Sequence, residues 1–219
     1  RKRDWALVSG RLKVRSAVAL TIALIIIFEL SSFFLNTFVL MLSPVVLFLF
    51  VTDPMLKKYT SWRHIYMGSV IGVGVLAGYL SVVPCFPTSP EIYLLFIASS
   101  LWIGGFDMIY VIPDMDYDMK NELKTVMVKY GLKKGLIISD VTHGFAFLFF
   151  ALLILYFNTY YYAAALIIIL YLIVRQHAIV DPERPETIRS SFFNSNSFIG
   201  FVFLISVILS IAIPLKIPA

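Results

Sequence analysis

Four aspartates lie in and directly after a long apolar stretch near the middle of the chain. Asp107 lies inside this stretch, and Asp114, Asp116 and Asp118 follow it. In a continuous helix, at about 100° per residue, Asp107, Asp114 and Asp118 would fall within roughly 40° of one another. Asp116 would point the opposite way. Carboxylates facing lipid are very costly, so the row must face protein, water or a cation. The spacing therefore predicts a functional site.

Asp114 and Asp118 are the candidate metal ligands within this row. They are four residues apart, which makes their carboxylates neighbours on one face of a helix. Two close carboxylates repel each other unless a cation lies between them. Mg²⁺ suits this position because it takes one or two carboxylates and completes its coordination with water and phosphate oxygens. The pair therefore predicts Mg²⁺ and a diphosphate ligand.

Basic residues near the aspartates could bind the phosphates of such a ligand. Lys57, Lys58 and Arg63 follow the second apolar run, and Lys124 follows the aspartates. Ammonium and guanidinium groups form strong, charge-assisted hydrogen bonds with phosphates. The alternative is a solvated loop, because basic residues collect on the cytoplasmic side of membrane proteins. His64 is either an interfacial residue or a partner for a polar group of a second substrate.

The composition identifies an integral membrane protein. The chain has 219 residues, of which 60% are hydrophobic and 14% charged, and its mean hydropathy is +0.89. These values lie far outside the range of soluble domains. Seven apolar runs are about long enough to span a bilayer, at 17–36, 38–52, 65–84, 91–113, 136–157, 159–176 and 195–215. We therefore predict an all-α, polytopic membrane helix bundle that forms a single domain over residues 1–219.

The distribution of Lys and Arg supports seven spans. If residues 1–15 are cytoplasmic, alternating spans place 53–64, 114–135 and 177–193 on the same side. Together with Arg175, these segments hold 17 of the 18 basic residues. The aspartate site is therefore predicted on the cytoplasmic side. The net charge of +5 follows from this topology, so we expect membrane lipid and an anionic substrate as partners, and no nucleic acid.

Polar and small residues inside the spans have structural explanations. Glu29 is expected to form a hydrogen bond with Ser31, Ser32 or another helix, rather than to act in catalysis. Asp140 and His143, three residues apart, are expected to pair with each other. The third apolar run contains glycines spaced for close packing between helices: Gly68, Gly72, Gly74 and Gly78.

Several site classes are excluded by the sequence. Three scattered histidines and a single cysteine, Cys85, have no zinc-binding spacing and allow no internal disulfide. There is no glycine-rich phosphate loop and no G-x-S-x-G nucleophile motif.

The order of the motifs resembles a known membrane enzyme family. Residues 105–110 are G-F-D-M-I-Y, residues 114–118 are D-M-D-Y-D, and residues 129–131 are K-Y-G. This order is similar to the second aspartate motif of the UbiA superfamily of intramembrane prenyltransferases, G-F-D-I-I-Y, D-x-x-x-D and K-F-G. The resemblance runs from about Ser9 to the C-terminus. Further residues resemble the 4-hydroxybenzoate polyprenyltransferase branch: Trp62, His64, Gly68, His177, Phe192, Phe193 and Asn196.

The resemblance implies nine transmembrane helices, an allylic prenyl diphosphate donor, and Mg²⁺ held between two aspartate motifs. The first motif, N-x-x-x-D-x-x-x-D, is absent here. We therefore expect two further helices and that motif to precede Arg1, and we expect the 219-residue piece alone to be inactive.

The implied reaction is electrophilic prenyl transfer, in which Mg²⁺ and basic residues neutralise a departing diphosphate and an aromatic acceptor attacks the allylic cation. Asp107 would orient a ligand or take the acceptor proton. The candidate residues are Asp107, Asp114 and Asp118 for catalysis, with Asp114 and Asp118 as metal ligands; Lys57, Lys58, Arg63 and Lys124 for the diphosphate; and His64 for the acceptor.

Three departures from the family pattern leave substrate preference open. Asp53-x-x-x-Lys57 stands where the family often has Y-x-x-x-K, and Met127 stands where a proline is usual. The arginine that commonly precedes the Ser-Gly turn falls on Trp5, which leaves Arg3 as a displaced candidate. The acceptor is expected to be 4-hydroxybenzoate or a related aromatic ring in quinone biosynthesis, with a glycerol-phosphate ether lipid precursor as the alternative.

Other classes of protein remain as alternatives. A cation-coupled transporter would use intramembrane acids, but it does not explain carboxylates placed among lysines at the edge of the membrane. A non-catalytic lipid-binding subunit would explain the missing first motif. The CDP-alcohol phosphotransferases also use membrane aspartates, but their D-G-x-x-A-R run is not found in this sequence.

Overall fold

Apolar segments in lipid must satisfy their backbone hydrogen bonds internally, which favours helices. The computed structural model describes residues 5–218, without the side chain of Phe192, so Arg3 lies outside the described residues. Within residues 5–218, seven helical segments are long and apolar enough to cross a membrane. The predicted all-α membrane helix bundle with seven spans is confirmed.

The spans closely follow the hydropathy pattern and differ mainly at one end. The predicted last span began at residue 195, but the helical segment begins at Pro185, because a π-helical turn joins two α-helices into one rod. The segments are α1 (Val14–Leu35), α2 (Thr37–Leu56), α3 (Arg63–Val82), α4 (Pro90–Tyr110), α7 (Leu132–Leu152) with α8 (Ile154–Phe157), α9 (Tyr160–Ala178), and α10 (Pro185–Ser190) with η2 (Ser191–Ser195) and α11 (Asn196–Ala212).

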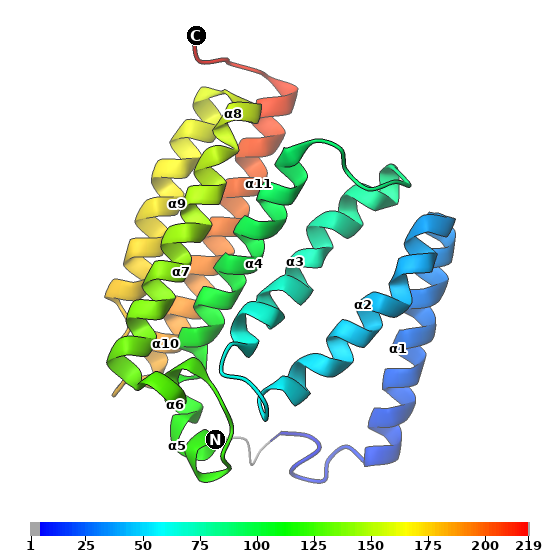
Figure 1. Cartoon of the computed structure of the whole chain (residues 1–219), viewed down its shortest axis with the longest axis vertical. Coiled ribbons are helices and arrows are strands. Elements are labelled where there is room, and N and C mark those ends of the chain that lie inside the picture. Colours follow the sequence, from blue (N-terminus) through cyan, green and yellow to red (C-terminus); the bar gives the residue numbers. More distant parts are fainter. Residues whose placement is uncertain (1–4, 219) are drawn as a thin grey trace. The chain divides into compact units, whose positions relative to one another are not determined.

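The described residues divide into two compact units, and the first contains α1 and the beginning of α2. It comprises the described residues up to Leu49 together with Ala77–Phe86. The α1 and α2 helices run antiparallel about Asn36 (Figure 1), whose side chain accepts a hydrogen bond from Val39 N–H at 2.9 Å. Ser43 Oγ donates a 2.6 Å hydrogen bond to Glu29 Oε2. The predicted structural role of Glu29, through another helix, is confirmed.

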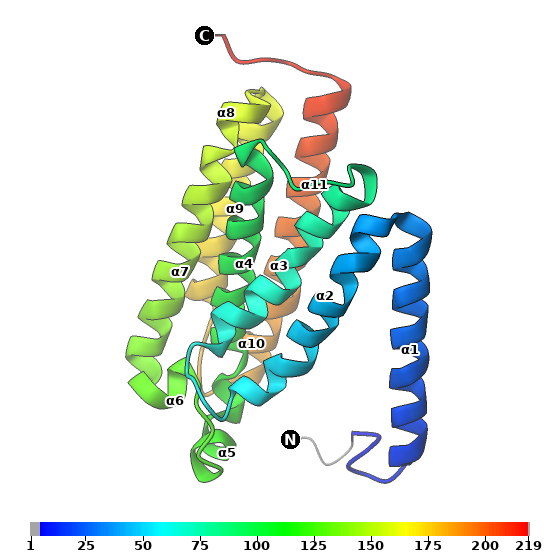
Figure 2. The ribbon, with the colours of Figure 1, turned by 45° about the vertical axis from the view of Figure 1, so that its right-hand side comes forward.

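The second unit, Phe50–Leu76 and Pro87–Ala219, is built around α4, α7, α9 and α11. These four helices lie side by side in both views (Figures 1 and 2). Tyr162 of α9 is fully buried, and its hydroxyl donates a 2.7 Å hydrogen bond to the carbonyl oxygen of Phe150 in α7. Such interhelical packing and hydrogen bonding hold helices together in lipid, where hydrophobic burial gives no driving force.

Two of the four glycines in α3 allow its backbone to approach α4 closely. A Cβ atom added to Gly68 would lie 2.1 Å from Ser100 O, and one added to Gly72 would lie 2.3 Å from Ser100 Oγ. The close packing predicted for this helix is therefore confirmed at Gly68 and Gly72. It is wrong for Gly74 and Gly78, where no described atom would lie within 4 Å of an added Cβ.

The chain between α4 and α7 forms three short helical pieces. They are the 3₁₀ turn η1 (Ile112–Asp114), α5 (Met115–Lys120) and α6 (Val126–Tyr130). Thr125 caps α6 by accepting a 3.1 Å hydrogen bond from Val128 N–H. Gly131, with φ +77°, makes the turn into α7. Residues 57–62 together with 111–131 form the loop end of the second unit.

Candidate active site

Asp107 and His64 form a buried pair where α3 and α4 meet the loop end. His64 Nδ1 donates a 2.6 Å hydrogen bond to Asp107 Oδ2, and the two side chains are 0% and 7% exposed. His64 Nε2 lies 3.4 Å from the Val126 backbone nitrogen and accepts its N–H. The hydrogen-bond partners thus assign the ring proton to Nδ1. Both nitrogens of His64 are used within the protein, so the predicted contact with an acceptor requires the Val126 bond to open.

Arg63 extends this pair to the end of α2. Its Nη1 lies 3.4 Å from Asp107 Oδ2, and its Nη2 lies 3.2 and 3.0 Å from the two carboxylate oxygens of Asp53. Arg63 is 12% exposed, so its charge needs the two carboxylates around it. Its Nε is buried and has no hydrogen-bond partner among the described residues, which leaves a donor for a ligand.

Lys57 and Asp118 form a second pair, between the end of α2 and α5. Lys57 Nζ lies 2.8 and 2.7 Å from the two oxygens of Asp118, which is 1% exposed. Backbone hydrogen bonds reinforce this contact, because Lys124 N–H donates to Lys57 O at 2.6 Å and Leu123 N–H donates to Asp118 O at 2.8 Å. The chain therefore positions Asp118 by long-range contacts and not by one helix alone.

The single helical row predicted for Asp107, Asp114 and Asp118 is wrong. The α4 helix ends at Tyr110, and Pro113 lies in the 3₁₀ turn that follows. Proline lacks an N–H and cannot continue the α-helical hydrogen-bond pattern, so the phase of α4 is lost. Asp107 faces His64, whereas Asp118 faces Lys57.

Asp114 ends this 3₁₀ turn and is half-buried. Asp116 is exposed, which agrees with its predicted outward direction.

Asp114 and Asp118 fit Mg²⁺ by type and number. Among the described residues, no group of three or more His, Cys, Asp or Glu side chains forms a complete metal site. Mg²⁺ commonly takes only one or two protein carboxylates when phosphate oxygens and water supply the remainder. The Lys57 ammonium already lies against Asp118, so a cation and a lysine would share this carboxylate.

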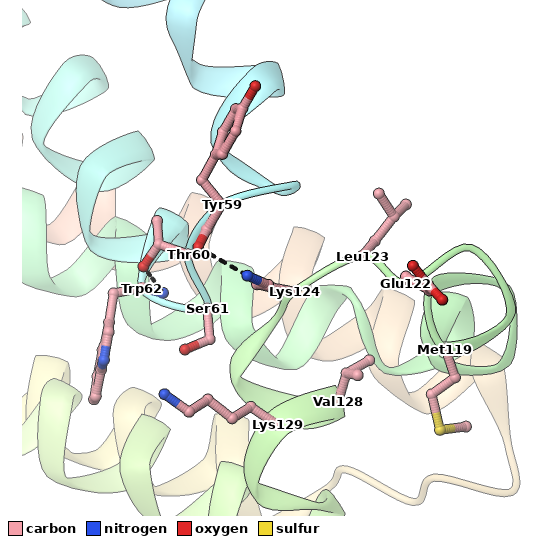
Figure 3. A pocket seen from close by; sticks show the side chains of 10 residues that line it. All are labelled: Tyr59, Thr60, Ser61, Trp62, Met119, Glu122, Leu123, Lys124, Val128 and Lys129. Atoms are coloured by element: carbon pink, nitrogen blue, oxygen red, sulfur yellow. Dashed lines mark hydrogen bonds between the residues drawn. The ribbon is translucent and has the colours of Figure 1, made fainter.

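The two remaining predicted phosphate ligands, Lys58 and Lys124, also belong to the loop end. Lys58 is exposed in the turn after α2. Lys124 Nζ donates a 3.3 Å hydrogen bond to Tyr59 O and lines a pocket that neither Asp114 nor Asp118 lines (Figure 3). In this structure the Lys124 ammonium therefore contacts a backbone carbonyl and not the two candidate metal ligands.

A third polar group was not predicted in its observed form. His177 of α9 lies between Asp140 and His143 of α7, with Nδ1 at 2.5 Å from Asp140 Oδ1 and Nε2 at 2.6 Å from His143 Nδ1. His143 Nε2 donates to Trp102 O in α4 at 3.0 Å. The expected direct pairing of Asp140 with His143 is wrong, because the ring of His177 comes between them. The sequence feature that could have indicated this contact is the position of His177 at the end of a span.

The fold and the site define the class of this protein. It is a helical membrane protein with buried acid–base pairs at one end of its bundle. Comparison with known families gives a consistent result, since the model of the UbiA prenyltransferase family matches residues 1–208. The chain belongs to the UbiA prenyltransferase family.

Curated relatives carry the name 4-hydroxybenzoate octaprenyltransferase. The protein of Francisella tularensis subsp. mediasiatica (strain FSC147) is 28% identical over 127 residues, which is 58% of this chain and 44% of the relative. The protein of Pseudoalteromonas translucida (strain TAC 125) is 26% identical over 204 residues, 93% of this chain and 69% of the relative. The matched part thus spans less than half of the Francisella protein.

Two solved structures share the fold. The apo structure of a UbiA homolog from Aeropyrum pernix K1 has a TM-score of 0.84 and 28% sequence identity, covering 96% of this chain and 78% of that one. A structure described as digeranylgeranylglyceryl phosphate synthase in membranes has a TM-score of 0.65 and 24% identity, covering 95% and 75%. The second similarity concerns the fold alone.

Proposed function

We propose that the protein transfers a prenyl group from an allylic prenyl diphosphate to an aromatic acceptor such as 4-hydroxybenzoate, with Mg²⁺, in quinone or related lipid biosynthesis. Membership of a prenyltransferase family and the names of the curated relatives support this activity. The observation that carries the proposal is the buried Asp118 carboxylate, held by Lys57 four residues after Asp114 in the chain. The excess of Lys and Arg supports a cytoplasmic position for this site.

Asp114 and Asp118 would hold Mg²⁺, which when bound neutralises charge on the departing diphosphate. Lys57 would turn from Asp118 to a phosphate oxygen, because an ammonium group forms charge-assisted bonds with either anion. Arg63 would donate through its free Nε. These contacts place positive charge where negative charge develops as the carbon–oxygen bond of the donor breaks.

Asp107 is the candidate base for the acceptor. In the proposed reaction, the diphosphate leaves with the electron pair of the carbon–oxygen bond, and a ring carbon of the acceptor bonds to the allylic carbon. The ring then loses one proton. His64 N–H and Arg63 both contact Oδ2 of Asp107, so Oδ1 is the oxygen that would take this proton.

The test is prenyl transfer by full-length protein in membranes, supplied with geranyl or longer diphosphates and 4-hydroxybenzoate, with products measured by mass spectrometry. Asp114→Ala and Asp118→Ala should each lower the rate by on the order of 100-fold. Asp116→Ala removes the same charge from an exposed neighbour and is the matched control. Undiminished transfer in the Asp114 and Asp118 variants would refute the metal assignment.

A second assay separates the other candidate functions. Transfer to a glycerol-phosphate ether precursor, with none to 4-hydroxybenzoate, would replace the aromatic acceptor in the proposal. Ion-driven uptake into vesicles that depends on Asp107, without release of diphosphate, would instead indicate a transporter.

A further inference from the structure

A pocket of about 470 Å³ opens at the loop end (Figure 3). One wall comes from the segment between α2 and α3, and the other comes from the end of α5 through α6. Asp107, Asp114, Asp118 and Lys57 are not among the residues that line it. The lining residues are Tyr59, Thr60, Ser61, Trp62, Met119, Glu122, Leu123, Lys124, Val128 and Lys129.

The pocket lies at the depth where spans end. Trp62 directly precedes α3, which begins at Arg63, and Lys129 comes three residues before α7 begins at Leu132. The side chains of Tyr59 and Trp62 are 69% and 45% exposed, respectively. Exposed Tyr and Trp next to span ends are typical of the membrane–water interface, where lipid headgroups lie.

Two lysines give the pocket more positive charge than its one acid offsets. Lys124 Nζ bonds to the neutral carbonyl of Tyr59, and Lys129 Nζ lies 5.2 Å from the centroid of the Tyr130 ring. In the part of the chain that the structure describes, neither ammonium forms an ion pair. Glu122 is the one acid among the lining residues, so the lining carries an excess of one positive charge.

The same pocket offers neutral groups that suit a phosphate ester. The hydroxyl-bearing residues Thr60 and Ser61 lie on the same wall as Tyr59 and Trp62. Met119 and Leu123 supply apolar surface on the opposite wall. A cationic pocket with hydroxyl donors and an apolar rim matches a ligand that has a phosphate at one end and hydrocarbon at the other.

We propose that this pocket binds the phosphate headgroup of an anionic membrane lipid. Lys124 and Lys129 contact the phosphate oxygens, and Tyr59 and Trp62 flank the glycerol region. A soluble phosphate such as inorganic pyrophosphate shares the phosphate chemistry but gains nothing from the apolar rim. The proposal does not rest on prenyl transfer, because lipid binding tests it whatever the protein catalyses.

The experiment measures binding of phosphatidylglycerol and phosphatidylcholine to the full-length protein in detergent by native mass spectrometry. The double variant Lys124→Gln/Lys129→Gln should bind phosphatidylglycerol more weakly, by about fivefold for each lysine, because one basic residue near an anionic surface contributes about that factor. Lys133→Gln/Lys134→Gln removes the same charge from exposed residues outside the pocket and is the matched control. The double arginine variant, Lys124→Arg/Lys129→Arg, should retain binding.

Selective loss in the pocket variant, with no competition from inorganic pyrophosphate, supports the proposal. Equal losses in the pocket and control variants would overturn it, and so would unchanged binding in the pocket variant. Displacement of the lipid by pyrophosphate through the same two lysines would overturn the lipid assignment and identify a soluble phosphate as the ligand.

Discussion

His64 joins Asp107 to the loop end through opposite edges of one ring: Nδ1 lies 2.6 Å from the carboxylate, and Nε2 accepts the Val126 N–H at 3.4 Å. The ring therefore connects the last turn of α4 with the first residue of α6. The position of Asp107 and the position of the loop before α7 are coupled by a single buried side chain.

Replacing His64 should test this connection. His64→Ala removes both hydrogen bonds, which leaves Val126 N–H without a partner and Asp107 with Arg63 alone, so we expect a loss of about 2–4 kcal/mol in the free energy of unfolding. His64→Asn keeps a donor near Asp107 and should lose less. Thermal unfolding in detergent measures both, and equal stability of His64→Ala and wild type would contradict the coupling.

Lys57 and Asp118 can be tested with a double-mutant cycle. Lys57→Ala leaves a buried carboxylate unpaired and should destabilise the protein by about 3 kcal/mol. The further change Asp118→Ala removes that unpaired charge, so the double variant should be more stable than Lys57→Ala alone. Lys58→Ala is the neighbouring control. A purely additive cycle would show that the two side chains do not interact in the membrane.

Magnesium removal should separate Asp114 and Asp118 from Asp116. We expect a chelator to abolish prenyl transfer and added Mg²⁺ to restore it, because the departing diphosphate needs neutralisation. Asp114→Asn and Asp118→Asn should require a higher Mg²⁺ concentration for half-maximal rate, whereas the exposed Asp116→Asn should follow wild type. Identical Mg²⁺ dependence in all three variants would place the metal elsewhere.

The backbone of Gly105 lies against the ring of His143. A Cβ atom added to Gly105 would lie 2.6 Å from Cδ2 of that ring. Gly105→Ala should therefore cost about 1–3 kcal/mol through overpacking. Gly144 of α7 is a matched control, because no described atom lies within 4 Å of its added Cβ. Gly144→Ala should stabilise by about 0.5–1 kcal/mol through helix propensity. Equal effects on the melting temperature would disprove this packing.

The loop between α9 and α10 should loosen in acid. Asp181 accepts a 2.6 Å bond from Arg184 Nε, and this bond, with a second from Glu183 N–H, lowers the pKa of Asp181. A lowered pKa means that the contribution to loop stability is present above the ordinary aspartate pKa and is lost as pH falls through the lowered value. Amide hydrogen exchange at Glu183 measures this. Arg184→Gln should weaken protection already at neutral pH, and unchanged protection would contradict the role of the bond.

The seven spans could be predicted because hydropathy and the Lys/Arg distribution report directly on the membrane. The aspartate row could not, because it assumed one continuous helix, and Pro113 ends the α-helical pattern before Asp114. Span counting also placed Lys57 on the same side as the aspartates. Its contact with Asp118 depends on how α2 meets α5, which local spacing does not determine.

The contacts from Asp140 through His177 and His143 to Trp102 O connect three helices, α7, α9 and α4. His143 is the residue at which they meet, because its Nδ1 faces His177 of α9 and its Nε2 faces Trp102 O of α4. Replacing this one buried ring would therefore remove a polar contact between α7 and each of its two neighbours at once.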